Sequence, residues 1–293
     1  MRDIIKFGFL IVLLVLTYIY RVNIATFITE KIIYRGSNEV LTYNEYYSEN
    51  NYLYVQNTDS NNAKSYQEIL NILYTIINSG DDCFTFRCGY DGCVNDIRKI
   101  TNDNNVVSNI NNFVHPYNSF DSININISTN REITVKIKKI YSEEQIEFIN
   151  QYINDFINKN LNLSMSNYDK IKAFHDFIIN NTIYDEENKF ESYTAYNLIT
   201  SGLSICGGYS DIMAIYLNKL GINNYKITSK NHIWNLVELD GTWYHLDVTW
   251  DDPIASDGKQ YLIHNFFMIT TEKLFSLDNL EHNFNTTTYS EAN

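Results

Sequence analysis

An Asp-Gly pair, Asp240 and Gly241, divides the run "NHIWNLVELDGTWYHLDVTW" at residues 231–250 into two halves rich in β-forming residues. An Asp-Gly pair between two such runs is typical of a two-residue type I′ hairpin turn. A loop of these two residues fixes the pairing of both strands, because each residue before the turn then has one partner after it. In this register Trp234 faces Asp247.

The same register places candidate functional side chains on one face of the hairpin. Side-chain direction repeats every two residues along a strand, so His232, Trp234 and Asp247 share a face, together with His245 nearer the turn. His232 and Asp247 are diagonal neighbours, about 7–8 Å apart between backbones and within side-chain reach. An acid in that position can orient an imidazole. A one-residue bulge would put them on opposite faces, so the prediction depends on the hairpin.

Cys206 lies at the start of a predicted helix, whose apolar side chains recur at helical spacing until Gly221 ends it. Free N–H groups and the positive end of the helix dipole at this position favour a reactive thiolate. Gly207 and Gly208 would allow a substrate backbone to approach closely. Taken alone, a cysteine at a helix start is more often a buried structural thiol than a nucleophile. A nucleophile needs a base, and His232 supplies one.

These segments together resemble the transglutaminase-like superfamily of papain-like cysteine enzymes, particularly its bacterial members. The segments that carry the resemblance are "CGGYS" at 206–210, "HIWNLVELDGTWYHLDVTWDDP" at 232–253 and "DKIKAFHDFIINNTIYD" at 169–185. A fourth, "HNFFMITTEKL" at 264–274, resembles the closing strand and helix of those proteins. The resemblance implies an α+β, papain-like fold in which a helix bearing the cysteine packs on an antiparallel sheet bearing the histidine and the acid.

The resemblance also implies a catalytic triad. Cys206 would be the nucleophile, His232 the general base and then acid, and Asp247 the residue that orients the imidazole. The substrate class would be a peptide or protein amide, with no cofactor and no metal. Water would resolve the thioester in a peptidase or amidase, which is the expected activity. A lysine amine would instead give a protein cross-link, as in a transglutaminase, and a non-catalytic module that binds peptide or cell wall is the remaining alternative.

The oxyanion site is only partly specified by the sequence. The backbone N–H of Cys206 is a natural donor. Animal transglutaminases use an upstream tryptophan as the second donor, but all three tryptophans here follow the cysteine, so Tyr196 is the substitute candidate. Trp234 and Trp250 are expected to form the walls of the site, with plain core packing as the alternative. Gly207 is included among the candidate substrate-binding residues.

An apolar run at residues 4–20, "IIKFGFLIVLLVLTYIY", predicts a membrane anchor within residues 1–25. A cleaved signal peptide and a buried helix are the alternatives. The expected location is therefore membrane-anchored, with the catalytic domain on the extracytoplasmic side. The formal net charge of −13 repels phosphate backbones, so nucleic acid is not an expected partner.

Residues 26–141 predict an accessory α/β region and residues 142–293 the catalytic domain. Apolar periodicity predicts a helix over 64–79, and the alternating runs "CFTFRCGYDGCV", "SININIS" and "EITVKIKKI" predict a small antiparallel sheet. Ser142 with Gln145 forms a capping-box pattern at the start of a further helix. Another helix is expected to cover the apolar positions that begin at Ile171.

The remaining cysteines and acids predict structural roles. Cys83, Cys88 and Cys93 lack the spacing and the fourth ligand of a zinc site. In an exported domain two of them would form a disulfide, and in a reducing compartment all three would be buried thiols. His175, on the apolar side of its helix, is expected to be a hydrogen-bonded core residue. The pair at 251–252 before Pro253 predicts a turn rather than a calcium site.

Overall fold

The computed structural model describes residues 18, 20, 21, 40–186, 192–254 and 261–293. The chain divides into two units, Met1–Val40 and Leu41–Asn293, and the elements named below belong to the second. Most of the anchor expected within residues 1–25 lies outside the described residues. In the part of the chain that is described, no helix has both the length and the apolar character needed to cross a bilayer.

The first sheet of the second unit has the strand order β1-β2-β4-β3. Its strands are Asn62–Ala63 (β1), Cys83–Cys88 (β2), Phe120–Ile127 (β3) and Glu132–Lys139 (β4). β1 runs parallel to β2, whereas β2 pairs with β4 and β4 with β3 in antiparallel fashion. The predicted pair of alternating runs is confirmed as β3 and β4, with Ile125 opposite Val135. Alternate side chains of β4 are buried, as a sheet with one covered face requires.

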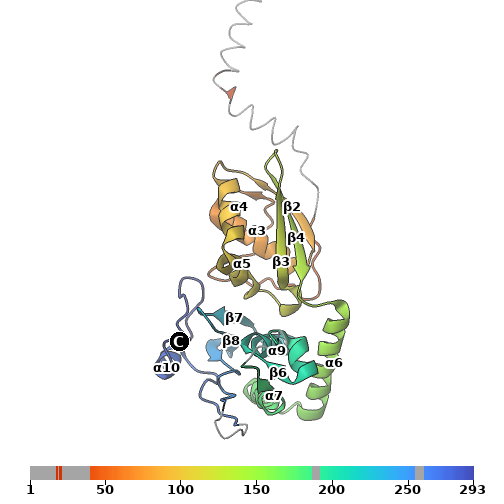
Figure 1. Cartoon of the computed structure of the whole chain (residues 1–293), viewed down its shortest axis with the longest axis vertical. Helices are drawn as coiled ribbons and strands as arrows, with labels where there is room; N and C mark the ends of the chain where they lie inside the picture. The colour runs from red at the N-terminus through yellow and green to blue at the C-terminus, as the bar shows by residue number, and fades with distance from the viewer. Residues whose placement is uncertain (1–17, 19, 22–39, 187–191, 255–260) are drawn as a thin grey trace, which may run out of the picture. The chain divides into compact units, whose positions relative to one another are not determined.

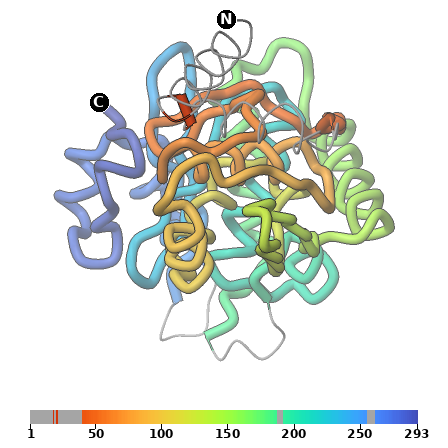
Figure 2. Tube along the Cα trace, turned by 90° about the horizontal axis from the view of Figure 1, so that it is seen from above, coloured from red at the N-terminus to blue at the C-terminus, as the bar shows by residue number. Residues whose placement is uncertain are grey.

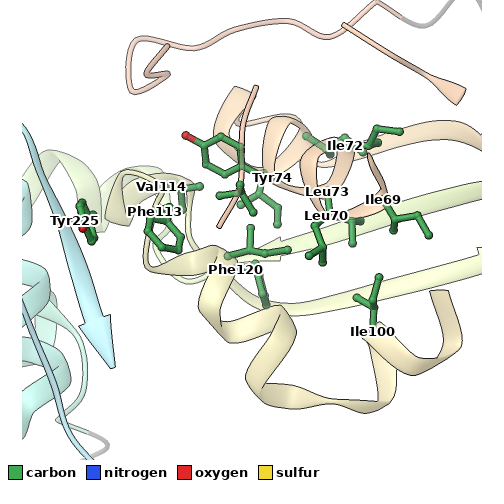
Figure 3. Packing of buried hydrophobic residues seen from close by; sticks show 14 of the residues in the cluster. Ile69, Leu70, Ile72, Leu73, Tyr74, Ile100, Phe113, Val114, Phe120 and Tyr225 are labelled. Atoms are coloured by element: carbon green, nitrogen blue, oxygen red, sulfur yellow. The ribbon is translucent and has the colours of Figure 1, made fainter. Parts of the chain in front are cut away.

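Helices pack against this sheet and close its core. They are Tyr66–Ser79 (α3), Cys93–Asn102 (α4) and Asn104–Asn111 (α5), followed by the 3-10 helix η2 (Pro116–Asn118). The predicted helix at 64–79 is confirmed as α3, which Ser65 caps and Gly80 ends in the left-handed conformation, with φ 85°. Figure 3 shows the apolar side chains of α3, among them Leu70 and Leu73, gathered with Phe120 and Ile100.

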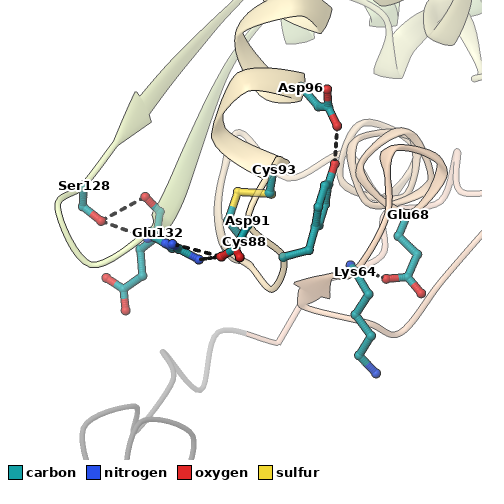
Figure 4. Close-up of a disulfide and its surroundings, with 10 residues drawn as sticks. Lys64, Glu68, Cys88, Asp91, Cys93, Asp96, Ser128 and Glu132 are labelled. Atoms are coloured by element: carbon teal, nitrogen blue, oxygen red, sulfur yellow. Dashed lines mark hydrogen bonds and ion pairs between the residues drawn. A yellow bond between two sulfur atoms is a disulfide. The ribbon is translucent and has the colours of Figure 1, made fainter. Parts of the chain in front are cut away.

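A disulfide joins the end of β2 to the start of α4. Cys88 and Cys93 are bonded, while Cys83 is a free, exposed thiol (Figure 4). Of the alternatives left open by the sequence, the structure therefore has the oxidised one. The alternating run expected to continue to residue 94 ends earlier, because Cys93 begins α4.

The second half of the unit begins with two long helices, Glu143–Asn160 (α6) and Asn167–Asn181 (α7). The capping box of Ser142 and Gln145 at the start of α6 is confirmed, since each side chain bonds the other residue's backbone N–H. Shorter elements follow: Ile183–Tyr184 (β5), Ala195–Ser201 (α8) and Leu203–Ser204 (β6). β5 and β6 pair in parallel, and none of these three was expected from the sequence.

The central helix Cys206–Lys219 (α9) packs on a three-stranded sheet with the order β7-β8-β9. The strands are Asn224–Thr228 (β7), Ile233–Leu239 (β8) and Thr242–Leu246 (β9), and the helix Thr271–Leu277 (α10) follows. The predicted hairpin register is confirmed, since Leu239 pairs with Thr242 and Asn235 with Leu246. Asp240 and Gly241 both have positive φ, at 52° and 80°, as a type I′ turn requires.

Two hydrophobic clusters fill the unit. One combines the core of the first sheet with one face of the β7-β8-β9 sheet and the C-terminal segment, where Phe284 and Tyr289 are buried. The other joins helices α6 to α9 to residues such as Val237 and Leu246. The first cluster crosses the boundary expected at residue 141, so the accessory region and the catalytic part share buried surface. The C-terminal segment and α6 lie on opposite sides of the β7-β8-β9 sheet and α9 (Figures 1 and 2).

Candidate active site

Cys206 is the first residue of α9, as the sequence predicted. Its thiol is free and half-buried. The chain just before Cys206 is held in two ways. β6 pairs with β5, and the N–H of Ile205 donates to Ser192 O at 3.0 Å. Ile205 occupies the N-cap position and has no side-chain group with which to cap. The first N–H groups of the helix are thus left to interact with a thiolate or an oxyanion.

His232 and Asp247 meet across the hairpin, as expected. His232 precedes β8 and Asp247 follows β9, and Nε2 of His232 donates to Oδ2 of Asp247 at 2.5 Å. The two side chains are 5% and 1% exposed, so the bond lies out of water. Because Nε2 is engaged with the acid, Nδ1 of His232 is the nitrogen left for Cys206, whose thiol is close enough to raise the pKa of the ring.

The surroundings of His232 hold it in the protonated form. Burial acts to lower its pKa, but the charge of Asp247, the hydrogen bond to that acid and the contact with Cys206 outweigh burial and raise the pKa to about 10. The pKa of Asp247 is displaced below its usual range, because the charge of His232 and bonds from two histidines overcome the opposing effect of burial. The charged imidazole of His232 is thereby buried beside its acid.

A second histidine, His282, contacts the same acid. Its Nε2 donates to Asp247 Oδ2 at 2.8 Å, and its ring is fully buried. Its Nδ1 donates to Asp278 Oδ2 at 2.9 Å. The other oxygen of Asp247, Oδ1, accepts from the backbone N–H groups of Thr249 and Trp250. No sequence pattern predicts a functional role for His282, because it lies in a segment without periodicity and bonds Asp247 from 35 positions away.

A third histidine, His245, lies on β9 of the hairpin and differs from His232 in its hydrogen-bond partners and pKa. Trp234 Nε1 donates to His245 Nδ1 at 3.0 Å, and His245 Nε2 donates to Thr271 Oγ1 at 2.9 Å. Burial, followed by the nearby charge of His282, lowers the pKa of His245 to about 3. His245 is therefore a neutral structural ring that fixes the indole of Trp234.

The rings of Trp234 and Trp250 pack against the ring of His232. The ring of Trp234 stacks on it with centroids 5.5 Å apart and planes 13° apart, and Trp250 lies at 6.2 Å. Trp234 is 1% exposed and Trp250 is half-buried. Both rings pack with the core, and their role as walls of a substrate site stays a prediction.

The two glycines after the cysteine lie against the protein's own backbone. A side-chain carbon added to Gly207 would meet Tyr193 O at 2.9 Å, and one added to Gly208 would meet Ser204 Oγ at 2.3 Å and Thr194 O at 3.0 Å. These residues therefore let α9 dock closely on the segment at 192–194. Contact of Gly207 with substrate stays a prediction.

Tyr196, the expected second oxyanion donor, lies on α8, where its ring contacts Phe148 of α6 at 5.6 Å. Another tyrosine, Tyr184 of β5, is close enough to Cys206 for the two charges to interact. Burial and, next, Cys206 raise the pKa of Tyr184. No local pattern predicts this neighbour, because β5 is a two-residue strand and Tyr184 pairs with Ser204, 20 positions away.

His175 and the acids at 251–252 lie beside the triad. His175 is fully buried, with Nδ1 bonded to Asp176 at 2.9 Å; its Nε2 is 3.2 Å from Asp251 Oδ2, but the two are not aligned as a hydrogen bond. Asp251 accepts from the N–H of Phe266, and Asp252 accepts from the hydroxyl of Tyr209. The polar contacts expected for His175 are present, and residues 249–251 form a turn.

Two groups among the described residues bring ligand-type atoms within reach of a single ion. They are His175, Asp176 and His264, and the set of His232, Asp247 and His282. In both groups the carboxylate accepts hydrogen bonds from the two histidines.

Comparisons with known proteins agree with this geometry over part of the chain. Residues 154–248 match the model of the transglutaminase-like superfamily. No curated protein matches the chain.

The solved structures that resemble it include a TGase, at 18% identity and a TM-score of 0.33, covering 48% of each chain. A protein from Cytophaga hutchinsonii described as a "Putative Cysteine Protease" is 14% identical, with a TM-score of 0.28, over 48% of this chain and 65% of that one. Menin is 12% identical, with a TM-score of 0.32, over 45% and 29%. The chain spans less than two thirds of the length of each of these structures.

Proposed function

From the match of residues 154–248 to the transglutaminase-like superfamily, we propose that the chain is a thiol-dependent acyl-transfer enzyme acting on peptide or protein amides. Cys206 is the nucleophile, His232 the general base and acid, and Asp247 the residue that orients and charges His232. Hydrolysis, as in a cysteine peptidase or amidase, is the proposed outcome.

One observation carries this proposal: His232 lies between a buried carboxylate and a thiol at a helix start. The 2.5 Å contact with Asp247 and the pKa raised to about 10 support a His232 that stays protonated beside Cys206 and can donate that proton. A merely structural histidine, such as His245 nearby, has the opposite shift, with a pKa lowered to about 3.

The proposed reaction has two halves. Sγ of Cys206 attacks the amide carbonyl and forms a C–S bond, and the developing oxyanion is held by the N–H of Cys206. His232 gives its Nδ1 proton to the leaving nitrogen as the C–N bond breaks, which leaves a thioester and a neutral imidazole. That imidazole then takes a proton from water, whose oxygen attacks the thioester. The products are a carboxylic acid and the restored thiolate–imidazolium pair.

An amine that attacks the thioester in place of water would give transglutamination. A site that binds without turnover would instead be a peptide-binding module.

The location is proposed to be extracytoplasmic, with residues 1–25 as the membrane anchor. The Cys88–Cys93 disulfide supports this, because such bonds persist in oxidising compartments. Retention of the full-length chain in membranes washed with alkaline carbonate is the expected result, and its release would exclude the anchor.

The test of the proposed function is the rate of Cys206 alkylation by iodoacetamide as a function of pH. Peptide mass mapping separates Cys206 from Cys83, the other free thiol that the structure describes. We expect Cys206 to react well below pH 8, and His232→Ala to remove that reactivity. Alkylation of Cys206 with the pH profile of Cys83 would exclude the Cys–His pair. A screen of peptides with and without amine donors, with Cys206→Ala as control, then separates hydrolysis, transfer and binding alone.

A further inference from the structure

His282 contacts the proposed catalytic acid from a part of the chain that neither the hairpin nor α9 supplies. It lies beyond residue 248, where the match to the superfamily model ends. Its ring nitrogens bond two different carboxylates, Asp247 through Nε2 at 2.8 Å and Asp278 through Nδ1 at 2.9 Å. Each of these contacts thus places a ring nitrogen against an acceptor oxygen.

The two imidazoles share a single oxygen. Oδ2 of Asp247 accepts from His232 Nε2 and also from His282 Nε2, while Oδ1 is occupied by two backbone N–H groups. Each donor draws on the negative charge of the carboxylate. A second donor on Oδ2 therefore weakens the attraction of Asp247 for the proton of His232.

We propose that His282 is a positioning residue of the Cys206–His232–Asp247 site, which shares the carboxylate with His232 and so limits how strongly Asp247 retains the proton on His232. The effect matters because a general acid must also release its proton. An imidazolium held too tightly donates poorly to a leaving amine. This inference rests on the proposed function.

The surroundings of His282 fix it in this role. Its ring stacks on Phe266 with centroids 5.2 Å apart and contacts the edges of Trp234 and Trp250 at 4.9 and 4.8 Å. Asp278 is held in turn by the backbone N–H groups of residues 280, 281 and 282. The ring cannot turn away from Asp247 without leaving this aromatic cage.

The titratable groups that face His282 are few among the described residues. They are Asp247, Asp278, His232 and His245, the last with a pKa lowered to about 3 and hence neutral across the working range. A change in the titration of His232 after replacement of His282 therefore reports on the shared acid.

The test compares the pH at which His232 loses its proton in the full chain, wild type against His282→Phe, with a chelator present, followed by NMR of 13C-labelled histidine rings and assigned with His232→Gln. Phenylalanine keeps the aromatic packing and removes both ring nitrogens. We expect the midpoint of His232 deprotonation to rise by about one pH unit, because Asp247 then stabilises the His232 cation alone. His282→Gln, whose amide can still donate to Asp247, should restore part of the difference.

Phe284→Leu is the matched control, since it alters the same buried segment and the same aromatic cluster without touching Asp247. An unchanged midpoint of His232 deprotonation in His282→Phe, a shift to lower pH, or an equal shift in Phe284→Leu would overturn the inference. These results differ from failure of the proposed function, in which wild-type Cys206 itself would react as an ordinary thiol.

Asp278→Asn provides a second variant in case His282→Phe does not fold. The side chain of Asp278 is 13% exposed. Its replacement by asparagine weakens the hydrogen bond to His282 Nδ1 and leaves no cavity in the core. We expect a shift in the same direction but smaller. An unchanged profile in this folded variant would count against the inference.

Discussion

Three histidines within one aromatic cluster show how the immediate partners of a residue decide its chemistry. His232 faces a carboxylate and a thiol and is held as a cation, whereas His245 accepts from an indole and stays neutral. His282 bridges two carboxylates. Burial alone disfavours the charged form of all three, so the acid is what separates them.

The first prediction concerns the pH dependence of stability. The folded pKa of His232, about 10, lies above its unfolded value of about 6.5. Its contribution to the free energy of unfolding is therefore fully present below about pH 6.5 and is lost as pH rises through about 10. Urea unfolding at pH 6 and at pH 9.5 should show a larger loss for wild type than for His232→Gln, by on the order of a few kcal/mol. Equal losses would contradict the paired state of His232.

The sequence could predict His232 and Asp247 but not His282, for a physical reason. The Asp240-Gly241 turn sets the pairing of its strands, and strand periodicity then sets the faces. His282 reaches Asp247 from a segment held by single contacts, and no local pattern encodes such a contact. Tyr184 was missed for the same reason.

Among the elements, α9 is the one that presents Cys206, and its position depends on close docking against residues 192–194. Gly207 and Gly208 make this possible, because neither has a side chain to hold the segment away. The long helices and the β3–β4 pair were predictable from their apolar periodicity. The short β5, β6 and α8 were not, because two to seven residues are too few to show a period.

The second prediction tests this docking. Gly207→Ala places a carbon 2.9 Å from Tyr193 O, which belongs to the backbone and must move. We expect a loss of about 1–3 kcal/mol in the free energy of unfolding and slower alkylation of Cys206 at neutral pH. Gly221→Ala is the control: with φ 69° and open space around it, it should cost stability through backbone strain and leave alkylation unchanged. Alkylation of Gly207→Ala at the wild-type rate would show that the docking does not position the thiol.

At the scale of the whole second unit, the accessory region and the catalytic part are joined by a common core. Tyr225 of β7 packs on Phe113 with centroids 5.2 Å apart (Figure 3). Asn112 bonds both the backbone of Lys226 and the hydroxyl of Tyr289. The sequence gives a boundary at residue 141 from a change of period. It does not show that both sides bury the same surface, since that depends on contacts far apart in the chain.

The third prediction follows from this shared core. A fragment of residues 142–293 alone should show no cooperative urea transition, because the face of β7 and β8 that meets Phe113 would be exposed. A fragment of residues 41–293 should unfold at the same urea concentration as the full chain, since the compact unit begins at Leu41. Cooperative unfolding of the 142–293 fragment would show that the catalytic part folds independently.

The bond between His282 and Asp247 also bears on the order in which the site forms during synthesis. A ribosome makes Cys206, His232 and Asp247 before it makes residues 278–282, so an emerging chain carries the thiol and its base while the acid still lacks its second histidine. We propose that His232 and His282 share the charge of Asp247, so His232 in such a chain binds its proton too firmly for turnover. Full activity would then arrive only after residues 278–282 have been made and have docked against Asp247.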